Sequence, residues 1–379
     1  MLRRTIGCCR LVYNKALHER SEAWTNGKKS IGYAEQDKRL TGWKQTEDLA
    51  FLNEVSCVPL QQALRHLQTA YSKFFKKQAS YPSFKKRRHG GKASFTRSAF
   101  RLKDGELWLA KTTTPLAIHW SRPLPEGAEP STVTVELDAA GRWHVSILCL
   151  DASIKKLKRA KTAVGIDVGL NALVTLSTGE HIANPRYDLG ELARKRTLSR
   201  RYARTQKGSR NRGKARLKLA RLHARVSDRR NDHMHKLTTR LVRENQAIVV
   251  EDLNVRGMVR NRSLARAISD AGWSMLVGQL AYKCEWYGRT LIKVDRWFPS
   301  SKTCSACGLV RDRLDLSERH WRCPSCGAEH DRDHNAAKNI CAAGLAVSTG
   351  DRAKACGAGV SQRVLRDAVQ SALKQEPAP

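Results

Sequence analysis

The sequence of 379 residues is poor in acidic residues: 35 Asp and Glu stand against 70 Lys and Arg, which gives a formal net charge of +35 at pH 7. Such an excess of one sign repels itself in a compact fold unless a polyanion neutralises it. Hydrophobic residues make up 41% of the chain, which excludes a charged, intrinsically disordered protein. At about 150 residues per domain, the length predicts two or three folded units. We therefore expect a folded protein that binds nucleic acid, with an anionic membrane surface as the second candidate.

Long apolar segments are also missing. No apolar run reaches the roughly 18 residues of a membrane-spanning helix, and no amphipathic tail accompanies a lipidation signal. Met1 to Arg4 leads into Cys8, Cys9 and Arg10 without the apolar segment of a secretory signal. These absences weaken the membrane alternative and predict a cytoplasmic chain. The 11 cysteines are an odd number in such a chain, which argues against a disulfide framework and for metal ligation by some of them.

The first 150 residues divide into a helical part and a strand-rich part. Residues 8–78 have helical character, and residues 60–74 carry one apolar face at helical spacing, as in the core of a small bundle. A basic connector at 80–91 follows. Residues 100–110 contain an Asp104-Gly105 hairpin signal, and the alternating segment 132–137 is expected to pair with 143–147. We predict a helical unit followed by a small, β-barrel-like unit and a basic linker at 155–161.

The second half has a different order of elements. Three short strands are expected at 163–169, 172–177 and 181–183, followed by a long helical stretch at 189–243 that Gly208 and Gly213 break into a hairpin. A strand at 247–251, a helix at 273–287, a strand at 290–295 and a helix at 333–343 complete the series. This is the element order of the ribonuclease-H-like fold, in which the first and fourth strands lie side by side.

The helical stretch at 189–243 is strongly basic. It carries 19 Lys and Arg between Arg194 and Arg243, opposed only by Asp228 and Asp232. A charge run is commonly a solvated face, but this density of one sign favours contact with nucleic-acid phosphates. We take as representative contacts Arg201, Arg204, Arg221 and Arg225.

The strongest local motif is a pair of CxxC sequences. Cys304 and Cys307 are followed after 15 residues by Cys323 and Cys326, the spacing of a four-thiolate zinc site. Gly308 and Gly327 follow the two pairs and allow the backbone to curl around the ion. Because all four ligands are protein thiolates, the site is closed, and we predict one structural Zn²⁺.

Three carboxylates stand at the ends of predicted elements. Asp167 follows the apolar start of the first strand, Glu251 ends the strand at 247–251, and Asp333 opens the last helix. In the ribonuclease-H-like order Asp167 and Glu251 become neighbours, and the last helix brings Asp333 over them. Clustered carboxylates repel one another unless divalent cations lie between them, which predicts two Mg²⁺ or Mn²⁺ ions. The alternative is that each acid is a cap or a solvated residue.

Neighbouring residues of this set have other expected roles. Strand alternation sends Asp252 to the face opposite Glu251, and Asp331 suits the N-cap of the last helix. Gly165 and Gly169 flank Asp167 and would let a metal or a bulky substrate approach the backbone.

With these motifs in place, the chain resembles the TnpB/OrfB proteins encoded by insertion sequences, which are RuvC-like, RNA-guided DNA endonucleases related to type V CRISPR effectors. The matching segments are GCCRLVYNKAL at 7–17, GIDVGLNALVTLSTG at 165–179, VVEDLNVRGM at 249–258, RWFPSSKTCSACG at 296–308, CPSCGAEHDRDHNAAKNI at 323–340 and KQEP near the end. Family members usually open with an extra β-strand before the segment matched at Gly7. This sequence starts almost at the helix, so either its start is misplaced or the β unit lacks a strand.

The resemblance implies functional roles. Asp167, Glu251 and Asp333 would form the catalytic triad, the four cysteines would hold the zinc ribbon, and Arg319 would face the cleaved strand or else make an ordinary phosphate or packing contact. The implied cofactors are Mg²⁺, Zn²⁺ and a guide RNA from the end of the transposable element, and the implied target is double-stranded DNA beside a short flanking motif. The implied domains are a helical recognition domain at 1–80, a β-barrel-like wedge domain and linker at 81–160, a RuvC-like domain at 161–297 with a helical hairpin at 189–243, a zinc ribbon at 298–329, a final helix at 330–343 and a disordered tail at 344–379.

Three functions compete at this point. The first is an RNA-guided, Mg²⁺-dependent DNA endonuclease, the second a nuclease-silent protein that binds DNA under RNA guidance, and the third a transposase acting on element ends. The presence of all three acids in motif context favours the first over the second. No strand-transfer or end-recognition module is identifiable for the third.

Overall fold

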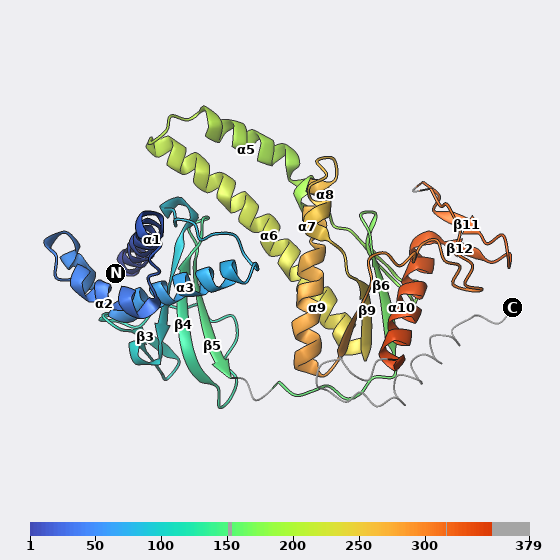
Figure 1. Ribbon diagram of the computed structural model, residues 1–379, viewed down its shortest axis with the longest axis horizontal. Helices are drawn as coiled ribbons and strands as arrows, with labels where there is room; N and C mark the ends of the chain where they lie inside the picture. The colour runs from blue at the N-terminus through green and yellow to red at the C-terminus, as the bar shows by residue number, and fades with distance from the viewer. Residues whose placement is uncertain (151–153, 316, 351–379) are drawn as a thin grey trace. The chain divides into compact units, whose positions relative to one another are not determined.

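The computed structural model describes residues 1–150, 154–315 and 317–350. The chain divides into two compact units (Figure 1). The first comprises Met1–Ser153 with Thr205–Arg221, and the second comprises Ile154–Arg204 with the described residues from Leu222 onward. Each unit has its own hydrophobic core. No helix among the described residues is long and apolar enough to cross a membrane.

The first unit begins with helices and continues with strands. Its elements are α1 (Leu2–Gly27), α2 (Tyr33–Trp43), the 3₁₀ helix Glu47–Glu54, α3 (Cys57–Phe75), short 3₁₀ turns at Arg87–His89 and Arg97–Ala99, β1 (Gly91–Thr96), β2 (Phe100–Lys103), β3 (Glu106–Leu109), β4 (Glu129–Leu137) and β5 (Trp143–Leu150). Strands β1, β4 and β5 form one antiparallel sheet in that order, and β2 pairs separately with β3.

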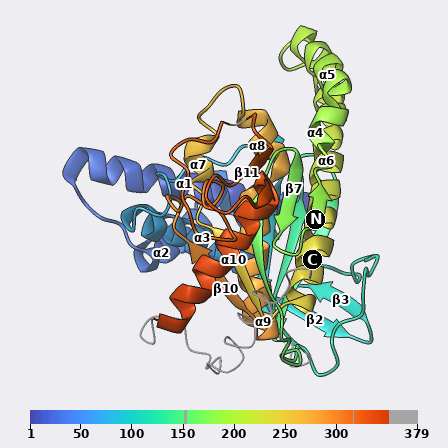
Figure 2. The same cartoon turned by 90° about the vertical axis from the view of Figure 1, so that its right-hand side faces the viewer.

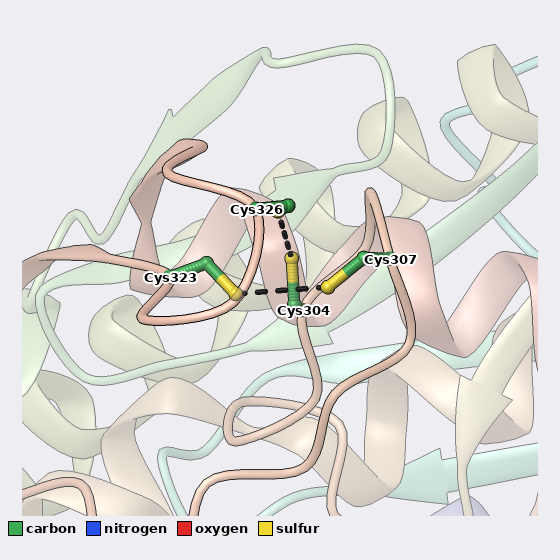
Figure 3. A group of neighbouring side chains, drawn as sticks. All are labelled: Cys304, Cys307, Cys323 and Cys326. Carbon is green, nitrogen blue, oxygen red and sulfur yellow. Dashed lines mark hydrogen bonds between the residues drawn. The ribbon is translucent and has the colours of Figure 1, made fainter.

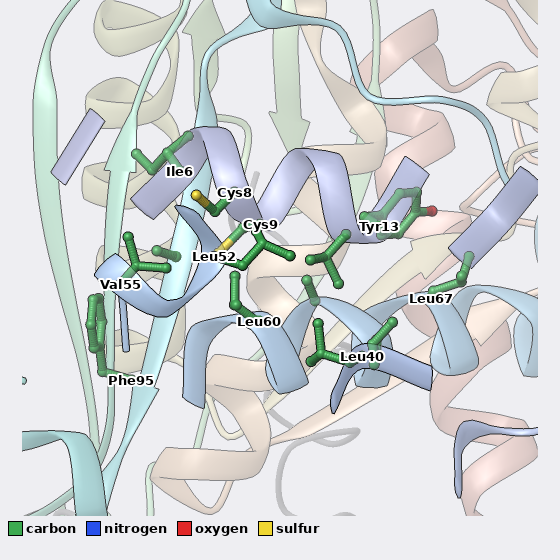
Figure 4. Packing of buried hydrophobic residues seen from close by; sticks show 14 of the residues in the cluster. Ile6, Cys8, Cys9, Tyr13, Leu40, Leu52, Val55, Leu60, Leu67 and Phe95 are labelled. Atoms are coloured by element: carbon green, nitrogen blue, oxygen red, sulfur yellow. The ribbon is translucent and has the colours of Figure 1, made fainter. Parts of the chain in front are cut away.

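One core joins these helices and strands. Leu60, Leu64 and Leu67 form the apolar stripe of α3 and are fully buried, as their helical spacing predicts. They belong to the same cluster as Phe95 of β1 and Val133 of β4, part of which Figure 4 shows. Each such side chain contributes roughly 1.5–3 kcal/mol by burial. The helices of 1–80 and the strands that follow therefore share a core.

The predicted β-hairpin at 100–110 is confirmed, but the prediction of a β-barrel-like unit is wrong. Asp104 and Gly105 both have positive φ, 53° and 77°, as a two-residue turn between β2 and β3 requires. The described strands form an open three-stranded sheet and a separate hairpin rather than a closed barrel. The sequence pattern did not indicate β1, which the structure places beside β4. Gly90 makes this pairing possible, because a Cβ there would lie 2.0 Å from the carbonyl oxygen of Leu137.

The second unit is built on one mixed sheet. Its strands are β6 (Ala163–Val168), β7 (Ala172–Leu176), β8 (His181–Ala183), β9 (Ala247–Glu251) and β10 (Thr290–Val294), in the order β10-β9-β6-β7-β8. Strand β9 is parallel to both of its neighbours, β10 and β6. The pairs β6–β7 and β7–β8 are antiparallel. The first and fourth strands thus lie side by side, which confirms the strand adjacency expected from the sequence.

The helices of this unit cover both faces of the sheet, as Figure 1 and Figure 2 show. The helices of the unit are α4 (Tyr187–Gly190), α5 (Leu192–Arg204), α6 (Arg210–Glu244), which starts in the first unit, α7 (Val255–Met258), α8 (Ala265–Ala271), α9 (Trp273–Tyr287) and α10 (Arg332–Gly350). Of these, α6, α8, α9 and α10 pack on the sheet. Residues of α6, α8 and α9 pack with Ile166 and Ile248 on one face, whereas Ile340 and Cys341 of α10 pack with Val249 and Ala247 on the other. A small pair, β11 (His320–Arg322) and β12 (Glu329–Asp331), precedes α10.

Two expectations about helix ends are wrong. Gly208, with φ of 87°, lies in the loop that separates α5 from α6, but Gly213 lies inside α6 and donates its N–H to the carbonyl of Ser209. Helix α10 continues to Gly350 instead of ending at 343, because Leu345 still packs in the core on Ala247. Residues 344–350, which the sequence predicts as part of the tail, therefore continue the helix, and residues 351–379 lie outside the described residues.

Candidate active site and metal centre

Asp167 and Glu251 lie on neighbouring strands with their side chains on the same face of the sheet. In the β6–β9 pair the last register partners are Ile166 and Val250, and the two acids follow them directly. A Cβ on Gly165 would meet α10, and Val249 contacts Gly344 of the same helix. Because side chains two residues apart share a face, Asp167 and Glu251 also lie on the α10 side.

The role expected for Gly165 and Gly169 is wrong. A Cβ at Gly165 would lie 2.2 Å from the carbonyl oxygen of Ala337, and one at Gly169 would lie 2.9 Å from the carbonyl oxygen of Ala172. Gly165 therefore lets α10 pack against β6, and Gly169 serves the turn into β7. At both positions the place of a side chain is taken by the protein's own backbone.

Asp333 lies in the first turn of α10. The turn is capped as expected, because the backbone N–H of His334 donates to Oδ1 of Asp331 at 2.8 Å. Asp252 is directed elsewhere, since its carboxylate pairs with Lys293 and Arg296. Asp252 is therefore directed away from Glu251, whereas Asp331 caps α10 and its charge still acts on Asp167.

The three acids interact electrostatically. Burial raises the pKa of Asp167 well above its ordinary value, and the negative charges of Glu251 and Asp333 raise it further. Burial also raises the pKa of Glu251. Burial is the first cause of both shifts, and the charge of Arg332 opposes the effect of the other carboxylates at Asp167. The donor atoms that the three side chains offer are carboxylate oxygens. Hard divalent cations such as Mg²⁺ prefer such donors, so these residues fit the predicted ions.

Two further residues contact the acids. The Ser300 hydroxyl donates to Oε1 of Glu251 at 2.6 Å, and Nη1 of Arg319 lies 3.4 Å from Oδ1 of Asp333. Arg319 was expected near the cleaved strand, and about half of its side chain is exposed. Ser300 was not anticipated from the sequence. The signal available for it was its position in the FPSSK segment, between a strand end and the first CxxC pair.

The four cysteines come together as a candidate metal centre (Figure 3). Their sulfur atoms all lie within 4.8 Å of one another, and they are the one group of at least three Cys, His, Asp or Glu residues in the described chain that satisfies this distance. The three carboxylates are accordingly more widely spaced than the thiols. Four thiols at this separation suit one tetrahedral Zn²⁺.

The two CxxC turns have the same backbone geometry. Gly308 donates its N–H to the carbonyl of Cys304, and Gly327 donates to that of Cys323, both at 2.9 Å. Both glycines have positive φ, 79° and 74°, which confirms the conformation expected of them. Backbone N–H groups of Cys326 and Ser325 help to lower the pKa of Cys323 to about 6, whereas burial and hydrogen bonds among the thiols raise the pKa values of Cys304 and Cys326. His330, which the sequence analysis missed, places Nε2 3.0 Å from Sγ of Cys304.

The basic stretch contains both paired and unpaired side chains. Lys195, Arg230 and Arg240 form ion pairs with Asp188, Asp270 and Glu180, so part of the charge is neutralised within the protein. The four representative arginines are exposed and form no ion pair with another described residue: Arg201 and Arg204 on α5, and Arg221 and Arg225 on α6. Their role in nucleic-acid binding stays a prediction.

Comparisons with known proteins match both halves of the chain. The OrfB_IS605 family model, described as "Probable transposase", matches residues 135–262, a Cas12f1-like TNB domain matches 273–340, and the helix-turn-helix domain of OrfB_IS605 matches 1–29. A "Putative RNA-guided DNA endonuclease" of Streptomyces pristinaespiralis is 57% identical, over 99% of this chain and 92% of its own length. The similarly named InsQ of Escherichia coli K12 is 33% identical, over 99% of this chain and 93% of its own length.

A solved structure shares the fold. The protein chain in a Cas12f1–sgRNA–target DNA complex aligns with a TM-score of 0.56 and 16% identity, over 89% of this chain and 81% of its own. The described architecture is thus similar to that of a Cas12f1 protein. Given the identity and coverage of the two bacterial relatives, the chain belongs to the TnpB/OrfB family.

Proposed function

We propose that this protein is an RNA-guided, Mg²⁺-dependent DNA endonuclease, encoded by a transposable element, that cuts double-stranded DNA next to a short flanking motif. The names of its two bacterial relatives support RNA guidance and DNA cleavage. The Cas12f1 protein of similar fold was solved with a guide RNA and target DNA, which supports the same partners here. The second unit would be the RuvC-like nuclease, with the zinc ribbon inserted before its last helix.

The observation that carries the proposal is the placement of Asp167, Glu251 and Asp333. Two of these acids lie near the carboxyl ends of adjacent strands, on the face covered by α10, and the third lies in the first turn of α10 itself. They would hold two Mg²⁺ or Mn²⁺ ions, which when bound activate a water molecule and stabilise the leaving oxygen of a phosphodiester. The sheet would carry two of the carboxylates and α10 the third.

Other residues of the chain would handle the nucleic acid. Arg319 places a positive charge beside Asp333, at a position where it can contact a backbone phosphate of the strand being cut. The exposed arginines of α5 and α6 would contact the phosphates of a guide–target duplex, which a protein reads through its backbone and A-form shape. The net charge of +35 suits such a polyanion.

The test begins with the RNA. The protein is purified from cells that carry its own element, and the copurified RNA is sequenced and used to programme cleavage of a matching DNA library. Asp167→Ala should abolish Mg²⁺-dependent cleavage and leave guide-dependent DNA binding nearly intact, because its task is to hold an ion. Asp252→Ala is the matched control, since this acid pairs with Lys293 and Arg296 and faces away from α10. Full cleavage by Asp167→Ala in Mg²⁺ refutes the assignment.

The same preparation decides between the competing functions. Guide-dependent DNA binding without cleavage by the unmodified protein would indicate a nuclease-silent binder. Joined products from the ends of the element would indicate a transposase.

A further inference from the structure

Glu251 receives one side-chain hydrogen bond from the described residues, and Ser300 supplies it. The Oγ–Oε1 distance is 2.6 Å, which is short for a neutral donor and usual for a hydroxyl bound to a carboxylate. Ser300 lies in the loop after β10, and it is only 6% exposed. A buried hydroxyl with one acceptor has a fixed orientation. The contact therefore restricts the Glu251 carboxylate to one rotamer, which a free glutamate would not keep.

The loop that carries Ser300 is itself held by α10. The side-chain amide of Asn339 donates to the carbonyl of Ser300 at 2.8 Å and to that of Thr303 at 2.6 Å. One turn earlier, Asn335 donates to the Thr303 carbonyl at 2.7 Å and accepts the N–H of Ser305 at 2.9 Å. Both asparagines are buried, at 7% and 2% exposure. Two amides at i and i+4 thus fix the backbone of residues 300–305, the segment that leads through the first zinc-site cysteine.

This segment connects the two elements that carry metal-binding acids. Glu251 ends β9 and Asp333 begins α10, and the two residues are far apart in the sequence. Ser300 reaches the first, and Asn335 and Asn339 project from the helix that carries the second. A shift of residues 300–305 along α10 would therefore move the Ser300 hydroxyl away from Glu251.

We propose that Ser300 is a positioning residue that orients Glu251 for metal binding, and that Asn339 holds Ser300 in place from α10. This rests on the proposed function in one respect, that Glu251 is a metal-binding acid. Groups that orient metal ligands in this way typically change metal affinity or activity by roughly 10–100-fold when removed. The alternative is that Ser300 only fills space beneath the zinc site, in which case metal affinity would not change.

Metal binding is measured directly on the protein–RNA complex, with Mn²⁺ as the probe and no DNA present, by electron paramagnetic resonance. Ser300→Ala should weaken Mn²⁺ binding by about tenfold or more and raise the Mg²⁺ concentration needed for half-maximal cleavage to the same extent. Ser300→Thr, which keeps the hydroxyl, should restore most of the affinity. Ser301→Ala removes the neighbouring hydroxyl, which has no hydrogen-bond partner among the described residues, and should bind Mn²⁺ like the unmodified protein.

Asn339→Ala provides an independent arm. It should weaken Mn²⁺ binding as well. The double variant with Ser300→Ala should bind Mn²⁺ no more weakly than whichever single variant has the lower affinity, because both changes break the same connection from α10 through Ser300 to Glu251. Unchanged Mn²⁺ binding by Ser300→Ala, or additive effects of the two changes, overturns the proposal. If Ser300→Ala loses zinc or folds poorly, the Mn²⁺ affinities of Asn339→Ala and Ser300→Thr are compared instead. The proposal requires that Asn339→Ala binds Mn²⁺ more weakly than Ser300→Thr. Failure of the proposed function gives a different result, because the unmodified protein would then bind Mn²⁺ no better than Asp167→Ala.

Discussion

Replacing Gly165 by alanine tests how closely α10 must approach the strand that carries Asp167. The added Cβ would lie 2.2 Å from the carbonyl oxygen of Ala337, about 1.2 Å closer than the 3.4 Å at which ordinary contacts begin. The same atom would lie 2.7 Å from the Cβ and backbone nitrogen of Cys341. The obstacle is helix backbone rather than the end of a flexible side chain, so α10 as a whole has to move by about 1 Å.

Overpacking of this kind costs typically about 1–3 kcal/mol of folding free energy. Helix α10 also carries Asp333, and a misplacement of about 1 Å at a catalytic group can lower the rate by about 100-fold. We therefore expect Gly165→Ala to lower the melting temperature and to reduce guided cleavage more strongly than the loss of folded protein explains. Thermal melting followed by tryptophan fluorescence and single-turnover cleavage measure the two effects.

Gly278→Ala is the matched control. This glycine lies in α9 of the same unit, is exposed, and has no heavy atom within 4 Å of an added Cβ. Alanine in an exposed helix interior is more favourable than glycine by about 1 kcal/mol, so this variant should be at least as stable as the unmodified protein. If Gly165→Ala melts and cleaves like Gly278→Ala, the close packing of α10 on β6 is not what fixes the site.

Three further predictions concern charge and metal. The pKa of Asp167 is raised in the folded state, so its contribution to stability is present at low pH and is lost as the pH rises through the folded-state pKa. Asp167→Asn should therefore raise the melting temperature near pH 7.5 in EDTA, and by less as the pH falls. An unchanged melting temperature would contradict the electrostatic argument. Cys304→Ser should release zinc and lower the melting temperature, because metal binding and folding share free energy in such sites; elemental analysis that finds no zinc in the unmodified protein would refute the metal assignment. Glutamine replacement of Arg201, Arg204, Arg221 and Arg225 should lower the affinity for all guide RNAs alike. It should also reduce the slope of log affinity against log salt, since fewer phosphates are neutralised. An unchanged slope would mean that these arginines form only a solvated face.

The sequence alone determined the features that depend on short-range pattern. The CxxC pairs with their following glycines specified the converging thiols, because a turn of four residues brings two sulfurs together wherever it occurs. Alternation and apolar runs specified β6, β7, β9 and β10, and the order of elements predicted that β6 and β9 are neighbours. Helical periodicity likewise specified α3.

Tertiary structure decided everything that depends on contact between distant segments. The hydrogen bond from Ser300 to Glu251 joins residues 49 positions apart, and the ion pair between Arg319 and Asp333 crosses from the segment between the two CxxC pairs to α10. The position of Gly165 beside Asp167 predicts room for a ligand, whereas its neighbour is the backbone of α10. The open sheet of the first unit depends on β1, whose pairing with β4 has no local signature. Local sequence fixes which face a side chain presents, but only the packing of helices on the sheet fixes what that face meets.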